Sequence, residues 1–232
     1  MKQHKLQIIA AGLALCFCAG AALADTVVIR ATGPGLKRGQ IIPTGAVVAL
    51  PRDSGALLLA PDGRTTQLKG PYSGSIAESE AAQRADANTA TVLSRLLTAS
   101  TRDTSALGGT RRVDLASPYA IALTGGNHCQ IAAERPRFER DSPRPKTAVT
   151  ITAASGASAS LVWPEDASEL GWPATVPFAA GSYSVSLDTM ATPIGITVWM
   201  VPAAIKNPAA LAQWMAEHNC TTQAMRLLTA LR

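Results

Sequence analysis

The chain has 232 residues, a formal net charge of +5 and only 16% charged residues. So mild a basic excess argues against a nucleic-acid-binding protein, which concentrates many more Lys and Arg residues on one surface. Aromatic residues make up 4% of the chain, and the many small residues favour small β-rich domains with modest cores.

The first 24 residues have the three parts of a cleavable secretory signal. Lys2 and Lys5 form a basic start, residues 6–21 are largely apolar, and residues 22–24 (Ala-Leu-Ala) suit a signal peptidase. A retained anchor is the alternative, but the apolar stretch is barely long enough to cross ~30 Å of hydrocarbon. We therefore expect a periplasmic mature chain that begins near Asp25 and has no transmembrane segment. Its net charge is +3, because removal of Lys2 and Lys5 with the signal subtracts two positive charges from +5.

Residues 25–74 predict a small β domain of short strands and tight turns. Strand candidates cover residues 26–30, 40–42, 46–50, 55–60 and 65–68. Turns are indicated at residues 43–45 (Pro-Thr-Gly) and 61–63 (Pro-Asp-Gly), because Pro presets φ and Gly accepts positive φ. Residues 70–72 (Gly-Pro-Tyr) are expected to end the domain.

Residues 75–112 predict a connecting helix followed by a linker. Leu93, Leu96 and Leu97 fall at helical spacing within an Ala-, Glu- and Arg-rich stretch that reaches residue 99. We expect a break in this helix near Asn88. Residues 100–110 are polar and contain Gly, so they are interpreted as the linker.

Residues 113–232 predict a second β-rich domain that ends in two helices. Strand candidates cover residues 119–123, 147–153, 158–163, 181–187 and 194–201, with a turn expected at 125–127. Asn207 and Pro208 suit the N-cap and the first position of a helix. Asn219 is expected to end that helix, and Thr222 to cap the next. The predicted fold is mainly β with minor α: two small β domains joined by a helix, with a C-terminal helical hairpin.

Cys129 and Cys220 are the two cysteines that remain when the signal is removed. Two cysteines in an exported chain most often pair, so we expect a disulfide. His128 and His218 stand close to them in the sequence, and a zinc or copper site or a Cys/His-dependent enzyme is the alternative. Their spacing matches no standard metal or hydrolase motif. We therefore expect no catalytic residue, no metal and no other cofactor.

Trp163 and Trp172 are each followed by Pro and flank an acidic segment. An exposed pair of indoles could stack on sugar rings and bind peptidoglycan or another glycan. Alternatively, each Trp packs at the end of a strand that Pro terminates.

Residues 135–146 hold several prolines, four arginines and one lysine, which predicts an exposed loop. The candidate contacts to an acidic partner or to anionic headgroups are Arg135, Arg137, Arg140 and Arg144. A solvated connector is the other interpretation.

The segment LKRGQIIPTGAVVALPRDSGALLLAPDGRTTQLKGPYSG, residues 36–74, resembles the periplasmic β module of FecR-type proteins. The matching positions are Gly39, Ile42, Thr44, Gly45, Asp62 and Gly63. The best-known members of that family relay a ligand signal across a membrane, which also requires a cytoplasmic domain and a membrane span. What the resemblance implies here is the ability of the module to dock against another envelope protein.

These observations lead to one main expectation about function. We expect a non-catalytic periplasmic binding or accessory module that docks on another cell-envelope protein through exposed strand edges or the 135–146 loop. Peptidoglycan or glycan binding through Trp163 and Trp172 is the alternative, and a Cys/His-dependent enzyme is the third hypothesis.

Overall fold

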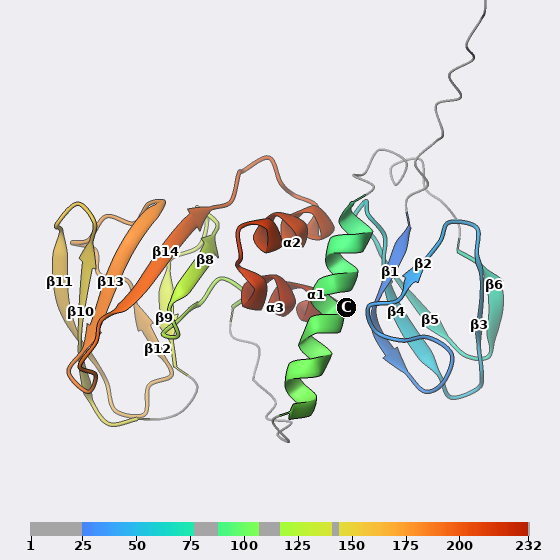
Figure 1. Cartoon of the computed structure of the whole chain (residues 1–232), viewed down its shortest axis with the longest axis horizontal. Helices are drawn as coiled ribbons and strands as arrows, with labels where there is room; N and C mark the ends of the chain where they lie inside the picture. The colour runs from blue at the N-terminus through green and yellow to red at the C-terminus, as the bar shows by residue number, and fades with distance from the viewer. Residues whose placement is uncertain (1–24, 77–87, 107–116, 141–143, 232) are drawn as a thin grey trace, which may run out of the picture.

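The computed structural model describes residues 25–76, 88–106, 117–140 and 144–231, and for residues 100–106 it describes the backbone alone. The fold is mainly β with minor α, as predicted. Two β units lie at opposite ends of an elongated body, and three helices lie between them (Figure 1). The expected signal, residues 1–24, lies outside the described residues.

The first β unit consists of a four-stranded sheet and a two-stranded sheet. The larger sheet has the order β2-β1-β4-β5, and β3 pairs with β6. Their bounds are β1 Thr26–Thr32, β2 Ile41–Ile42, β3 Val47–Leu50, β4 Gly55–Leu59, β5 Thr65–Lys69 and β6 Tyr72–Ser75. The five predicted strands are present. β6 was not predicted, because the sequence Gly-Pro-Tyr was interpreted as the end of the domain.

Both faces of the larger sheet are buried at its two central strands, β1 and β4. Val28 and Leu58 lie in the core shared with β3 and β6, whereas Val27 and Leu59 lie in the core shared with the helices. A strand that is buried on both faces has a nearly continuous apolar sequence rather than an alternating one. The runs Val-Val-Ile in β1 and Ala-Leu-Leu-Leu in β4 meet that requirement.

The second β unit is a sandwich of a five-stranded and a three-stranded sheet. Their orders are β11-β10-β13-β14-β8 and β12-β9-β7. The bounds are β7 Ile121–Ala122, β8 Gly126–Gln130, β9 Arg137–Glu139, β10 Thr147–Ala153, β11 Ser158–Trp163, β12 Glu169–Gly171, β13 Gly181–Leu187 and β14 Ile194–Met200. Val149, Val185 and Val198 face the three-stranded sheet and form one core with Phe138.

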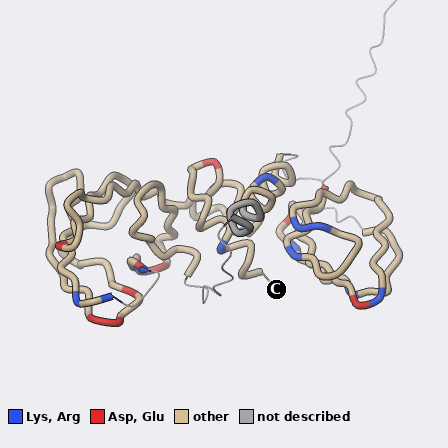
Figure 2. The backbone as a smooth tube through the Cα atoms, turned by 60° about the horizontal axis from the view of Figure 1, so that its bottom comes forward, with Lys and Arg blue, Asp and Glu red and all other residues tan. Residues whose placement is uncertain are grey.

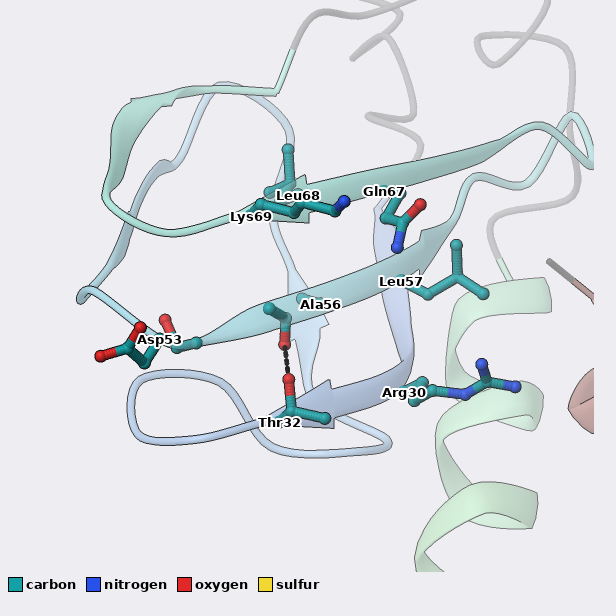
Figure 3. Close-up of a pocket in the computed structure, with 10 residues that line it drawn as sticks. Arg30, Thr32, Asp53, Ala56, Leu57, Gln67, Leu68 and Lys69 are labelled. Atoms are coloured by element: carbon teal, nitrogen blue, oxygen red, sulfur yellow. Dashed lines mark hydrogen bonds between the residues drawn. The ribbon is translucent and has the colours of Figure 1, made fainter.

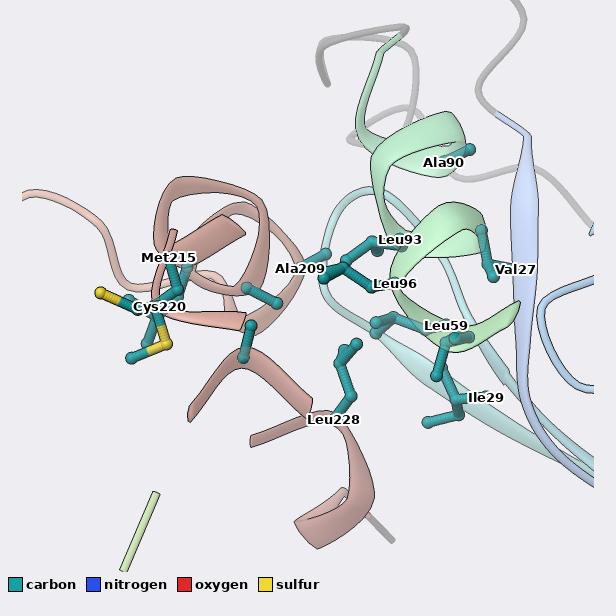
Figure 4. Close-up of a cluster of buried hydrophobic side chains, with 14 of the residues drawn as sticks. Val27, Ile29, Leu59, Ala90, Leu93, Leu96, Ala209, Met215, Cys220 and Leu228 are labelled. Atoms are coloured by element: carbon teal, nitrogen blue, oxygen red, sulfur yellow. The ribbon is translucent and has the colours of Figure 1, made fainter. Parts of the chain in front are cut away.

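The helices α1 (Thr89–Ala106), α2 (Pro208–Glu217) and α3 (Thr221–Ala230) share one core with the first sheet. Figure 4 shows side chains of the sheet, of α1 and of the α2–α3 hairpin pointing toward one another. Leu93 of α1 and Leu228 of α3 are both buried in this core. The C-terminal hairpin therefore packs against α1 and the first sheet, and it is also bonded to β8 of the second unit through Cys129 and Cys220.

Asn207 joins the start of α2 to the first β unit. Its side-chain oxygen accepts hydrogen bonds from the backbone N–H groups of Ala209 (2.8 Å) and Ala210 (3.3 Å), as an N-cap does. Its amide nitrogen donates to the carbonyl oxygen of Pro61 at 2.7 Å. Gly63 has a φ of +86°, and a Cβ there would collide with the Asn207 side chain. This close approach requires glycine in the β4–β5 turn.

Four local predictions were wrong. The predicted linker begins inside α1, which continues to Ala106. Gly126 and Asn127 belong to β8 rather than to a turn, and the predicted 135–146 loop contains β9. The N-cap of α3 is Cys220 rather than Thr222. The predicted N-cap at Asn207 is confirmed, and Asn219, with a φ of +60°, follows the end of α2 as expected.

Candidate functional site

The five-stranded sheet contains no Asp, Glu, Lys or Arg in any of its strands. In Figure 2 the charged positions of this unit fall in the surrounding loops and in the smaller sheet, while the strands of the large sheet are tan. One face of the sheet is the buried side of the sandwich. The other, which we call the open face, is formed by the alternate residues of each strand and is partly or fully exposed except at Cys129.

Small hydroxyl side chains cover most of the open face. Thr150 pairs with Ser160 at 2.9 Å between their hydroxyl oxygens, and Thr152 pairs with Ser158 at 3.0 Å. Further hydroxyls on this face are Ser182, Ser184, Ser186 and Thr197. A Cβ added at Gly195, which lies on the same face, would meet no atom within 4 Å. The face is therefore a neutral surface with free space above it.

The two edges of this sheet differ. The β8 edge is covered by α3, because the side chain of Gln223 hydrogen bonds to the backbone of Cys129. The disulfide between Cys129 and Cys220 holds the start of α3 at the same place, with 5.8 Å between the two Cα atoms. The predicted disulfide is thus present, and it joins the β8 edge to the helical hairpin.

Among the described strands, β11 pairs with β10 alone. The N–H of Ala153 donates to the carbonyl of Ala157, and the register is unbroken from Thr152–Ser158 to Thr147–Trp163. Along an antiparallel strand, residues alternate between directing their backbone N–H and C=O groups toward the partner strand and directing them away from it. Ala157 directs its groups toward β10. Ser158, Ser160 and Val162 therefore present N–H and C=O groups outward, and no described residue takes them as hydrogen-bond partners.

An aromatic group lies where β14 meets the helical hairpin. Trp199, which is 40% exposed, donates its indole N–H to the side-chain oxygen of Asn127 at 3.3 Å. His218 meets Trp199 edge-on, with 4.9 Å between ring centroids, and stacks on Trp214 at 3.9 Å. A ring nitrogen of His218 also lies 2.9 Å from the carbonyl oxygen of Trp214. We call Trp199, His218 and Trp214 the aromatic ledge.

His128 has quite different surroundings from His218. It is only 5% exposed, and burial and the nearby Arg226 guanidinium lower its pKa to about 4, despite a hydrogen bond to the backbone of Gly125. Within the described part of the chain, no group of three or more His, Cys, Asp or Glu residues could hold a metal ion. His128 lines a pocket of about 250 Å³ together with Arg226 and residues at the start of α3.

Arg226 of α3 forms an ion pair with Glu139 of β9. Both side chains are largely buried, at 16% and 8% exposed. The pair joins the helical hairpin to the smaller sheet of the sandwich, so it acts beside the disulfide in holding α3 against the second β unit.

The predicted exposed pair of indoles is not present. Trp163 is 1% exposed, and its indole N–H donates to the carbonyl of Ala167 at 2.9 Å. Trp172 is half-buried and stacks on Phe138, with 5.2 Å between ring centroids. Phe178 and Tyr183 meet the edges of Trp172. The packing interpretation is the correct one, and sugar stacking on this pair loses its structural basis.

The four arginines of the predicted loop have different environments. Arg140 donates to the carbonyl oxygens of Ala167 (2.8 Å) and Pro164 (2.8 Å) and lies over the Trp163 ring. Arg137 pairs with Glu169 across β9 and β12 at 2.9 Å. Arg135 and Arg144 are exposed. Arg140 therefore stabilises the loop, and the four residues do not form one uniform basic surface.

A pocket of about 310 Å³ lies on the first sheet, lined by residues of β1, β4 and β5 (Figure 3). Arg30 and Lys69 are among its lining residues, with Gln67 and Leu57. The single interaction drawn in Figure 3 joins the Thr32 hydroxyl to the carbonyl of Gly55 at 3.4 Å.

The sequence did not single out Trp199, Asn127 or Gln223. The strand prediction for residues 194–201 did contain a usable signal, because alternation places Trp199 on the face opposite Ile196 and Val198. The alternation does not indicate which of the two faces of the strand is exposed. Among the described residues, no helix is long and apolar enough to cross a membrane. A scan against protein-family models matched none of them, and a search of curated proteins found no match.

Proposed function

We propose that the protein is a non-catalytic accessory module of the cell envelope that docks on another envelope protein, which adds an extended strand to β11. The single observation that carries this proposal is the β11 edge. Its outward N–H and C=O groups form a row that an extended peptide can pair with.

The β11 edge lacks the features that normally prevent strand addition. Natural edge strands are protected by charged residues, Pro, bulges or short length. β11 is six residues long, contains no charged residue and no Pro, and keeps an unbroken register with β10. By comparison, β5 at the edge of the first sheet carries Lys69, and β2 is two residues long.

The position and side chains of β11 favour an extended segment of a partner as its occupant. β11 lies at the end of the body farthest from the first β unit (Figure 1). Leu161 and Ala159 pack at the edge of the core but remain partly exposed, so an added strand with apolar residues on its inner face would cover them. Pairing between two copies of β11 alone would bury much less than the ~800 Å² per partner of a stable interface.

The cellular location is part of the proposal. The signal-like start of the sequence supports export to the periplasm, and the disulfide is compatible with an oxidising compartment. The resemblance of residues 36–74 to FecR-type modules supports a docking role in the envelope. The FecR-like character of this segment is likewise a proposal.

The test is site-specific photo-crosslinking in intact cells. A photoreactive amino acid at Val162, which is 51% exposed, should capture one envelope protein reproducibly, and peptide mapping should place the crosslink in an extended segment. The same amino acid at Val47, which is 74% exposed on β3 of the other β unit, is the matched control. It should not capture that protein.

A charge variant supplies the second part of the test. Val162→Lys places a cation on the edge and should abolish capture from a photoreactive residue at position 160, while Val47→Lys leaves it unchanged. Capture that survives Val162→Lys, or equal capture from position 47, would contradict strand addition at β11. Crosslinks between two copies of this chain would show that the occupant of the β11 edge is a second copy of the chain and not an envelope protein.

A further inference from the structure

We propose that the open face of the five-stranded sheet, with Trp199 at one end, is a binding site for a neutral polysaccharide chain. This inference rests on side chains of the open face, whereas strand addition uses the backbone groups at the β11 edge. Either proposal can fail without the other.

Trp199 is the first element of the site because its ring is exposed and fixed in position. Among the described residues, the exposed large hydrophobic side chains are Val47, Val162, Met190 and Trp199, and Trp199, at 40% exposed, is the aromatic one. The hydrogen bond to Asn127 and the edge contact with His218 fix the orientation of the indole. A fixed aromatic ring loses little conformational entropy when a ligand packs on it.

The chemistry of the rest of the face selects the ligand class. A protein partner typically covers a centre that is more apolar than the polar rim around it. Here a single indole is followed by hydroxyl side chains, and the strands contain no charged residue. A sugar ring has an apolar C–H face that packs on an aromatic ring, and hydroxyls at its edge that exchange hydrogen bonds with Ser and Thr.

The hydroxyl groups continue from Trp199 across the sheet in a defined register. Thr197 lies beside Ser182, and Ser184 lies beside both Gly195 and Thr152. Because Gly195 leaves open space above the sheet, a chain of sugar units can lie flat from the indole toward β10. An anionic polymer has no described Lys or Arg on these strands to pair with, so the site fits a neutral chain.

The probes are chitohexaose, a neutral soluble oligosaccharide, and purified sacculi, whose glycan strands carry similar units. The intact protein should bind chitohexaose with a change in tryptophan fluorescence and should sediment with sacculi. Trp199→Ala should weaken chitohexaose binding about tenfold or more, because it removes the stacking surface. Trp199→Phe keeps an aromatic ring and should retain most of the affinity.

Val47→Ala is the matched control, since it shortens an exposed apolar side chain on the other β unit and should leave glycan binding unchanged. Circular dichroism and the melting temperature establish that each variant is folded. Equal affinity of Trp199→Ala and the unaltered protein, or no binding of either probe by the unaltered protein, would overturn the proposal.

Discussion

Gln223 forms two hydrogen bonds with the backbone of Cys129. Its side-chain oxygen accepts from the Cys129 N–H at 2.6 Å, and its side-chain nitrogen donates to the Cys129 carbonyl at 3.0 Å. A side-chain amide has both an acceptor and donors, so it can pair with an N–H and a C=O as the backbone of a neighbouring strand would. A single side chain of α3 thus replaces a sixth strand at the β8 edge.

Replacing Gln223 by Leu should therefore destabilise the protein. The change leaves the buried N–H and C=O of Cys129 without partners, at a cost of roughly 2–4 kcal/mol. Gln40→Leu is the control, because Gln40 is exposed and, among the described residues, its side chain accepts one hydrogen bond, from the Lys37 N–H. Urea unfolding should show a clearly lower midpoint for Gln223→Leu alone. Equal midpoints for both variants would contradict the role of Gln223.

Removing the disulfide should lower the stability of the protein relative to its oxidised form. Cys129 and Cys220 are separated by 91 residues in the sequence, and a loop of this size contributes up to ~4–5 kcal/mol in the chain-entropy description. The double variant Cys129→Ala/Cys220→Ala should melt at a lower temperature than the oxidised protein. A reducing agent should lower the melting temperature of the unaltered protein but not that of the double variant.

Stability should fall in acid because His128 is buried in its neutral form. Its pKa in the folded protein is about 4, below the ordinary value near 6.5. The unfolded state therefore binds a proton first as the pH falls. The stability due to neutral His128 is fully present above about pH 6.5 and is lost progressively toward pH 4, up to about 3 kcal/mol.

The groups that act on His128 are the Arg226 guanidinium, which lowers its pKa, and the Gly125 backbone, which raises it. Arg226 in turn forms an ion pair with Glu139. His128→Gln should reduce the loss of stability between pH 6.5 and 4, measured by unfolding at each pH. His218→Gln should leave the loss in place. The same slope in His128→Gln and the unaltered protein would refute the assignment.

Breaking the Arg226–Glu139 pair on one side should cost more than removing both charges. Arg226→Met leaves a largely buried carboxylate without its partner, which typically costs about 3–5 kcal/mol. The double variant Arg226→Met/Glu139→Gln should recover part of that loss. A double-mutant cycle by chemical denaturation measures the coupling, and strictly additive effects would show that the two charges act independently.

Regular elements were predictable where the local pattern determined them. β10 and β13 alternate cleanly between buried and exposed residues, and Asn207 with Pro208 marked the start of α2. β8 and β9 were missed for a physical reason. The start of β8 has glycines typical of a turn, and β9 has three residues among prolines and arginines. Pairing with β14 and β7 makes them strands, and those partners are far away in the sequence.

The candidate sites were less predictable than the fold. Trp163 and Trp199 both end or nearly end a strand, and alternation cannot tell which side of a sheet faces another layer. Gln223 lies in an amphipathic helix whose sequence does not identify the backbone it contacts. The disulfide was predictable without knowledge of the packing, because the expectation needed only two cysteines and an expected oxidising compartment.

Arg30 of β1 donates a hydrogen bond to the carbonyl of Thr229 near the end of α3, at 3.2 Å. Leu228 of α3 is buried in the same core as Val27 and Leu59 of the first sheet. During synthesis the first sheet and α1 therefore emerge long before α3, which contributes the last residues of their shared core. The side of this core that faces the α2–α3 hairpin must remain exposed until almost the whole chain has been made.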